Sequence, residues 1–84
     1  MEVRFLPAAL QDLSALDASI IRRVVNRLER LVSNWEHIQP EPLSGELSAL
    51  YKLRVGNYRV LYQVLPSEKA ILIHQIGHRR EIYR

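Results

Sequence analysis

The stretch YKLRVGNYRVLYQV, residues 51–64, decides the fold that we predict for this chain. Its first five residues alternate between apolar and basic side chains, as in a strand with one buried face. Gly56 and Asn57 follow, and both residue types tolerate a positive φ, which favours a two-residue hairpin turn. Apolar side chains alternate again after the turn. The stretch therefore predicts two antiparallel strands, residues 51–55 and 58–65.

The hairpin brings three basic side chains to one face of the predicted sheet. A two-residue turn places Arg54 directly opposite Arg59, and Lys52 lies further along the same face. Like charges that face each other on paired strands destabilise a sheet. Such a pair is tolerated when an anion lies between the two groups, or when both side chains extend into water. We expect an anion site here, and a shift of the register by one residue would remove it.

The segment before the hairpin predicts a strand and two helices. Residues 2–6 alternate as a short strand that Pro7 closes, and leucines at three-residue spacing then indicate a first helix. Asp17 or Ser19 can cap a second helix. The apolar stripe of this second helix consists of Ile21, Val24, Val25, Leu28, Leu31, Val32 and Trp35.

A loop and a last strand complete the layout. Residues 37–45 contain two prolines and are typical of a loop, and residues 70–76 predict a strand. The order βααβββ predicts an α+β fold, with both helices packed on one face of a mostly antiparallel four-stranded sheet. Because no linker or repeat interrupts the sequence, we expect one domain over residues 1–84.

Composition limits the class of protein. The chain has 84 residues, 48% hydrophobic content and no cysteine, so we expect a folded protein without disulfides or thiolate metal sites. No apolar run is long enough for a membrane span, which predicts a soluble, cytoplasmic protein. Lys and Arg number 12 against 9 acids, and ten of the twelve are Arg. Since guanidinium groups bind phosphate through two parallel hydrogen bonds, this charge favours nucleic acid or an acidic protein as the partner.

The second helix carries much of this positive charge on the face opposite its apolar stripe. Arg23, Arg27 and Arg30 have the spacing of one helical face. We interpret them either as a solvated face or as a contact for phosphates or for an acidic partner.

The end of the chain, IGHRREIYR at residues 76–84, adds a second set of polar side chains. Those able to bind phosphate or move protons are His78, Arg79, Arg80 and Tyr83. Consecutive strands usually lie side by side, so we expect these residues near the basic face of the hairpin. A metal-independent ribonuclease needs such groups, because it must move protons and hold a pentavalent phosphate. The acidic residues are not clustered as a two-metal nuclease requires, and we expect neither a metal nor a cofactor.

The hairpin string YKLRVGNYRVLYQV and the closing string GHRREIY together resemble the RelE side of the RelE/ParE toxin superfamily. The element order, the length and the basic charge are similar over essentially the whole chain. The resemblance implies the toxin of a type II toxin-antitoxin system, a ribosome-dependent endoribonuclease that cleaves mRNA in the A site. It also implies a cognate antitoxin, with an acidic and partly disordered segment, as the partner that holds the toxin inactive.

The resemblance assigns roles to individual residues. Lys52 and Arg54 match two catalytic basic residues on the first hairpin strand, and Arg59 matches a phosphate-contacting Arg on the second. Arg79 and Tyr83 match the basic residue and the tyrosine of the closing motif.

Two further residues resemble different branches of the family. The string PEPL at residues 40–43 resembles the YoeB branch, whose glutamate there is a general base, which points to Glu41. His78 matches either a histidine near the YoeB C-terminus or a second basic residue of RelE, so the general base stays open. The residues assigned to contact RNA or a partner are Arg23, Arg27, Arg30 and Arg80.

Two other functions are compatible with the sequence. ParE-like toxins inhibit DNA gyrase on the same fold without being enzymes, but they generally lack both the Lys/Arg hairpin face and the closing His/Tyr pair. The chain could also be an inactive module that binds nucleic acid or a partner protein. Toxicity with loss of translated mRNA would favour the ribonuclease, whereas blocked replication would favour the gyrase inhibitor.

Overall fold

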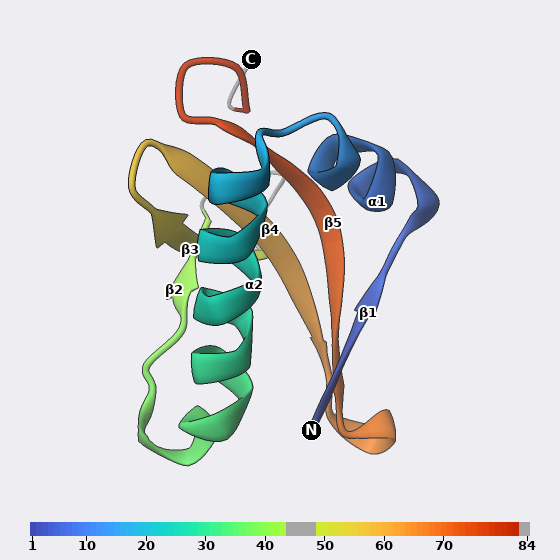
Figure 1. The fold of residues 1–84 in the computed structure, drawn as a ribbon. Coiled ribbons are helices and arrows are strands. Elements are labelled where there is room, and N and C mark those ends of the chain that lie inside the picture. The colour runs from blue at the N-terminus through green and yellow to red at the C-terminus, as the bar shows by residue number, and fades with distance from the viewer. Residues whose placement is uncertain (44–48, 83–84) are drawn as a thin grey trace.

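The computed structural model describes residues 1–43 and 49–82 and shows an α+β fold (Figure 1). The sheet has the strand order β1-β5-β4-β3-β2, in which only the β1–β5 pair is parallel. Short 3-10 turns follow α2 and join β4 to β5, at Trp35–His37 and Pro66–Glu68. The helices and strands are β1 (Glu2–Phe5), α1 (Pro7–Ser14), α2 (Ala18–Ser33), β2 (Glu41–Pro42), β3 (Tyr51–Val55), β4 (Tyr58–Leu65) and β5 (Ala70–His78).

The sheet has five strands, and the prediction of four was wrong. The additional strand β2 lies inside the segment that we interpreted as a loop, and it pairs Glu41 with Lys52 and Pro42 with Tyr51. Its proline is tolerated because β2 is the edge of the sheet, where one row of backbone donors has no strand partner. The end of the predicted loop, residues 44–45, lies outside the described residues.

Two element ends also differ from the prediction. Trp35 belongs to the 3-10 turn after α2, although the apolar stripe suggested that the helix includes it. Strand β5 continues through Gly77 to His78, beyond the predicted end at Ile76. Asp17 precedes α2, as predicted for a cap residue, but its side chain makes no capping hydrogen bond.

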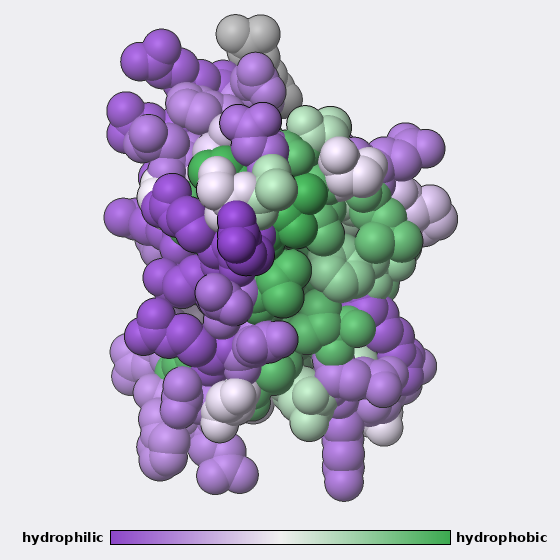
Figure 2. Space-filling model, viewed as in Figure 1, coloured by the Kyte–Doolittle hydropathy of each residue, from purple (hydrophilic) through white to green (hydrophobic). Residues whose placement is uncertain are grey.

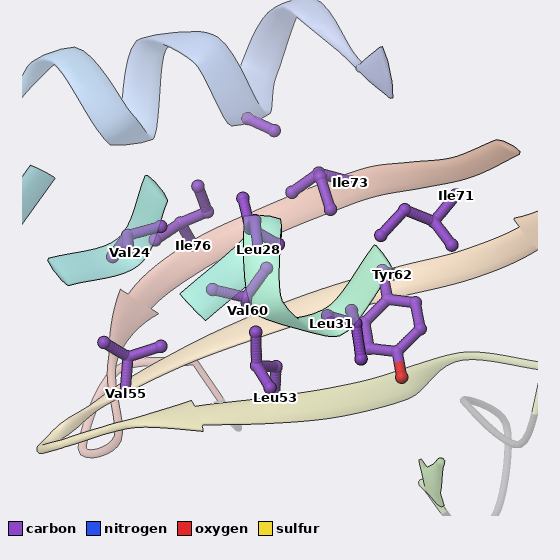
Figure 3. Close-up of a cluster of buried hydrophobic side chains, with 11 residues drawn as sticks. Val24, Leu28, Leu31, Leu53, Val55, Val60, Tyr62, Ile71, Ile73 and Ile76 are labelled. Carbon is purple, nitrogen blue, oxygen red and sulfur yellow. The ribbon is translucent and has the colours of Figure 1, made fainter. Parts of the chain in front are cut away.

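The core lies between α2 and the inner face of the sheet (Figure 3). Val24, Leu28 and Leu31 of α2 are at most 3% exposed, and α1 adds the fully buried Ala9. Leu10, in the predicted leucine spacing of the first helix, is instead 51% exposed. On the side shown in Figure 2, hydrophobic residues remain visible in a band between α2 and α1. The buried sheet residues of the cluster are Leu53, Val55, Val60, Tyr62, Ile71, Ile73 and Ile76.

A side chain of α1 binds a backbone donor of β5 beyond the last residue that pairs with β1. The parallel pairing of β1 with β5 ends at Phe5 and Ile73, and the β4–β5 register shifts between Leu61 and Tyr62. Beyond this point the backbone N–H of Ile76 donates to Oδ2 of Asp12, at 3.0 Å. No residue of β1 pairs with β5 at Ile76, so the Asp12 carboxylate accepts the hydrogen bond of the Ile76 N–H instead. Without it, this N–H would lose its hydrogen bond to water on folding.

Candidate functional site

The hairpin has the register that the sequence predicted. Arg54 lies directly opposite Arg59, and Val55 lies opposite Tyr58. Gly56 adopts the left-handed φ of 58° that allows the tight turn. Because residues directly opposite each other in a strand pair point to the same face, Arg54 and Arg59 share the face away from the helices, and Lys52 shares it too.

The Glu41 carboxylate binds two of these three cations. Its Oε1 atom lies 3.2 Å from Nζ of Lys52 and accepts a hydrogen bond from Nη2 of Arg54 at 2.9 Å. The pairing of β2 with β3 creates this contact, since it sets Glu41 opposite Lys52. Desolvation acts to raise the pKa of Glu41, but the Lys52 hydrogen bond and the charge of Arg54 outweigh it, so the pKa lies below the ordinary value of 4.5. Glu41 is therefore an anion at neutral pH.

The Arg59 guanidinium binds the hairpin backbone. Its Nη1 atom donates to the carbonyl oxygens of Gly56, at 2.9 Å, and of Tyr58, at 2.8 Å. The repulsion between the opposed arginines is thus relieved inside the protein, because Arg54 binds a carboxylate and Arg59 binds carbonyl dipoles. The Nε and Nη2 donors of Arg59 are not used in these two bonds.

A pocket of about 480 Å³ opens between α2 and the edge of the sheet. Arg27 and Arg30 line it from the helix, and Lys52, Arg54 and Glu41 line it from the strands. Lys52 and Arg54 project from the face away from the helices, but β3 lies next to the edge strand β2, and there they also border this pocket. In Figure 2 the surface over α2 and β2 is largely hydrophilic. Four cations therefore face one carboxylate among the described lining residues, and the pocket attracts anions. Its apolar lining comes from Leu31, Ile38, Pro40, Leu53 and Tyr62.

The three arginines of the α2 stripe do not share one environment. Arg27 and Arg30 line the pocket, whereas Arg23 lies against the hairpin turn. A Cβ atom built on Gly56 would lie 2.5 Å from Nη2 of Arg23, so the guanidinium covers this glycine closely. Arg23 is thus part of the packing of the turn.

The C-terminal segment is attached to the same turn. The backbone N–H of Arg79 donates to the carbonyl oxygen of Asn57 at 2.8 Å, and Arg79 and Arg80 are both exposed. His78 pairs with Tyr58 across β5 and β4, and the centroids of the two rings are 5.6 Å apart. The His78 side chain therefore projects from the helix-facing side of the sheet. The structure does not bring it onto the face of Lys52, Arg54 and Arg59.

A hydrogen bond sets the tautomer of His78. The backbone N–H of Arg80 donates to Nδ1 of His78 at 3.2 Å. Because this nitrogen accepts, the neutral ring carries its proton on Nε2. A second proton on Nδ1, which a general acid needs, has to displace the Arg80 N–H.

After His78 the chain turns toward the basic face. The backbone N–H groups of Glu81 and Ile82 both donate to the carbonyl oxygen of His78. The Ile82 side chain, 5% exposed, packs over Gly77, which lies opposite Arg59 in the β4–β5 pair. Tyr83, which the sequence assigned to the site, lies outside the described residues.

Residues 1–43 and 49–82, which the structure describes, contain no group of three or more His, Cys, Asp or Glu side chains that could hold a metal ion. None of their helices combines the length and the apolar character needed to cross a bilayer.

Comparison with known proteins identifies the class. A sequence profile described as the ParE toxin of the type II toxin-antitoxin system parDE matches residues 3–83. The toxin RelG of Mycobacterium tuberculosis is 33% identical over 82 residues, which is 98% of this chain and 94% of that protein. The putative toxin RelE1 of Methanocaldococcus jannaschii is 31% identical over 78 residues, 89% of this chain and 86% of the relative.

Solved structures agree with this class. The RelBE2 toxin-antitoxin complex of Mycobacterium tuberculosis contains a chain with a TM-score of 0.81 and 30% identity, covering 93% of this chain and 96% of that one. The isolated Escherichia coli RelE toxin has a TM-score of 0.77 over 96% of this chain and 88% of its own, and its 22% identity supports the fold alone. The protein is thus a toxin of a type II toxin-antitoxin system. It belongs to the RelE/ParE superfamily, in the RelE-like branch.

Proposed function

We propose that this toxin is a ribosome-dependent endoribonuclease that cleaves mRNA in the A site, without a metal, by attack of a 2′-OH on the adjacent phosphate. The observation that carries the proposal is the β3–β4 register, which sets Lys52, Arg54 and Arg59 on one face of the sheet. Three fixed cations on a rigid hairpin are suited to hold a phosphate whose negative charge increases in the transition state.

The arginines serve the phosphate and not the proton transfers. Guanidinium groups are charged in proteins under ordinary conditions, so Arg54, Arg59 and Arg79 can stabilise charge but cannot act as bases. Arg59 has unused donors for this purpose, and Arg79 lies exposed beside the hairpin turn to which its backbone is bound.

Proton transfer falls to the remaining titratable residues of the site. Lys52 or Glu41 takes the proton from the 2′-OH, because both lie on the strands that carry the phosphate-binding face. We assign protonation of the 5′-oxygen to His78. Because its side chain projects from the helix-facing side at the end of β5, the ring has to move toward the basic face for this role, and it has to release the Arg80 N–H when Nδ1 takes up a proton. Tyr83 then positions the scissile phosphate or stacks on a base. If His78→Ala cleaves at the wild-type rate and Tyr83→Phe does not, the acid is Tyr83.

The partner that silences the toxin is, in this proposal, a cognate antitoxin with an acidic and partly disordered segment. Relatives of this fold have been solved as toxin-antitoxin complexes, among them RelBE2 of Mycobacterium tuberculosis. The cationic pocket between α2 and β3 favours an acidic segment, since a disordered acidic chain can fold over such a surface and neutralise it.

Primer extension on ribosomes programmed with a defined mRNA tests the proposed activity. We expect cleavage in the A-site codon, with a 2′,3′-cyclic phosphate and a 5′-OH as the new ends, and poor cleavage of the same RNA without ribosomes. A supercoiling assay with DNA gyrase is the parallel measurement for the ParE-like alternative. Intact mRNA on ribosomes together with inhibited gyrase would replace the ribonuclease by that alternative, and intact mRNA with active gyrase would favour an inert binding module.

A further inference from the structure

The phosphate-binding face contains an anion that the chain itself supplies. One oxygen of Glu41 lies between Nζ of Lys52 and Nη2 of Arg54, at 3.2 and 2.9 Å. The Arg54 distance is one at which a guanidinium would hold a phosphate oxygen, and the Lys52 ammonium lies within ion-pair reach of the same oxygen. A ligand phosphate and the Glu41 carboxylate therefore compete for the same donors.

We propose that Glu41 is a built-in competitor, which occupies the anion site of the free toxin and is displaced when a phosphodiester of RNA binds. This inference rests on the proposed function for the identity of the ligand. It assigns to Glu41 a role in the free protein that is separate from any role in proton transfer.

The ion pairs of Glu41 are easy to open. The side chains of Glu41 and Arg54 are 45% and 60% exposed, and exposed ion pairs contribute little to stability because water and salt screen them. The Lys52 side chain is less exposed, at 21%, but its Nζ atom lies farther from the carboxylate, at 3.2 Å. The carboxylate lies on a two-residue edge strand, whose backbone pairing with β3 does not depend on that side chain. Displacement of the carboxylate therefore leaves the sheet intact.

A phosphodiester can use the pocket more fully than the carboxylate does. Within the described residues, the ion pairs of Glu41 are with Lys52 and Arg54, on the strand side of the pocket. Arg27 and Arg30 line the opposite wall, on α2. A nucleic-acid backbone carries a charge at every nucleotide, so one phosphate can replace Glu41 while the next reaches the helix arginines. The observed charges thus favour RNA over a single carboxylate.

The lowered pKa of Glu41 is consistent with this arrangement. The Lys52 hydrogen bond and the Arg54 charge overcome the effect of desolvation, so the carboxylate remains charged and keeps its place at neutral pH.

Equilibrium binding of a non-cleavable RNA tests the inference. The probe is a fluorescent single-stranded oligonucleotide with a methyl group on every 2′ oxygen, and anisotropy is measured at fixed ionic strength. We expect Glu41→Gln to bind the probe roughly five- to tenfold tighter than the wild type, because two weak ion pairs no longer oppose binding. The matched control is Glu29→Gln, which removes the same charge from the exposed side of α2 outside the pocket lining and should change affinity by less than about twofold.

A second variant locates the competition. If Glu41 competes at the Arg54 guanidinium, Glu41→Gln should increase RNA affinity much less in a protein that already carries Arg54→Gln. The Glu41→Gln/Arg54→Gln double variant is therefore compared with Arg54→Gln alone. Thermal unfolding of Glu41→Gln should match the wild type, which keeps a folding defect apart from a binding effect.

The outcomes separate this inference from the proposed function. If Glu41→Gln does not increase RNA affinity, or increases it only as much as Glu29→Gln does, the inference is overturned. The proposed phosphate site still stands in that case, provided that Arg54→Gln weakens RNA binding. RNA affinity that is insensitive to both Lys52→Gln and Arg54→Gln overturns the proposed phosphate site itself. A gain from Glu41→Gln in the binding of an oligoglutamate peptide, with no gain in the binding of the RNA probe, would assign the site to an acidic protein segment and overturn the choice of RNA.

Discussion

Arg54 and Arg59 lie directly opposite each other on neighbouring strands, yet their guanidinium groups bind different partners. Arg54 binds the Glu41 carboxylate, and Arg59 binds two carbonyl oxygens of the hairpin turn. A strand pair with two opposed cations is thereby stable without an external anion. The same register sets Lys52, Arg54 and Arg59 on one face of the sheet, which is the face that we propose binds a phosphate.

The hairpin turn should be sensitive to a side chain at Gly56. We expect Gly56→Ala to lower the free energy of unfolding by about 1–2 kcal/mol, because L-residues are strained at the φ of 58° found there. The new Cβ also approaches Nη2 of Arg23, but this flexible side chain can move, so Gly56→Ala/Arg23→Ala should recover only a small part. Urea denaturation measures both values.

Gly77→Ala is the matched control for Gly56→Ala. A Cβ at Gly77 would lie 3.8 Å from Cδ1 of Ile82, an ordinary van der Waals contact, and the backbone there is not left-handed. We expect a change within about 0.5 kcal/mol. An equal loss for both variants would contradict the account of the turn.

The hairpin was predictable because its determinants are local. Gly56 and Asn57 fix the turn, and the turn fixes the register of Arg54 against Arg59. Strand β2 was not predictable in the same way, because two prolines in a short segment usually indicate a loop, and the strand is only two residues long. The contact of Glu41 with Lys52 and Arg54 depends on that pairing and was missed with it.

The contact of Asp12 with Ile76 could not be predicted either. It joins residues 64 positions apart, and it depends on where β1 stops pairing with β5 and on the register shift in β4–β5. No local pattern in the sequence carries this information. Likewise, the last strand was predicted to end at Ile76, whereas the ladder with β4 continues to His78.

Asp12 should contribute to stability through the Ile76 backbone. We expect Asp12→Ala to lower the free energy of unfolding by about 1–3 kcal/mol, because a partly buried N–H loses its acceptor. Asp12→Asn keeps an oxygen in place and should recover most of the loss. Asp17→Ala, at a carboxylate without a capping bond, serves as the control and should have a smaller effect. Equal losses for Asp12→Asn and Asp12→Ala would contradict the role of the oxygen.

The Tyr62 phenol should make the protein sensitive to alkali. Desolvation raises the pKa of Tyr62 to about 12, and the nearby Tyr51 acts in the same direction. Below about pH 10 the phenol is neutral in both states, whereas between about pH 10 and 12 only the unfolded chain ionises it, which favours unfolding. The free energy of unfolding of the wild type should therefore fall relative to Tyr62→Phe over this range. A difference between the two that stays constant from neutral pH to about pH 12 would contradict the shift.

Binding of the antitoxin should weaken as salt increases. Arg27 and Arg30 face the pocket, so Arg27→Gln and Arg30→Gln should each weaken binding at low salt, by a factor on the order of tenfold, and reduce its salt dependence. Arg22→Gln, an exposed arginine of the same helix outside the pocket lining, is the control and should have little effect. Isothermal titration calorimetry over a range of ionic strengths provides the measurement. Affinity independent of salt would instead indicate an apolar interface.

In the proposed mechanism the hairpin cations hold the scissile phosphate. The rate at which Arg59→Ala cleaves mRNA on ribosomes in a single turnover tests this most directly. Arg59 lies on the basic face and has donors left for a phosphate after binding the turn. We expect Arg59→Ala to remain folded, to bind the antitoxin, and to cleave at least about 100-fold more slowly than the wild type, since it lacks a group that stabilises the transition state. Arg22→Ala, which removes the same charge from an exposed part of α2, should cleave at the wild-type rate. Cleavage by folded Arg59→Ala at the wild-type rate would contradict the claim.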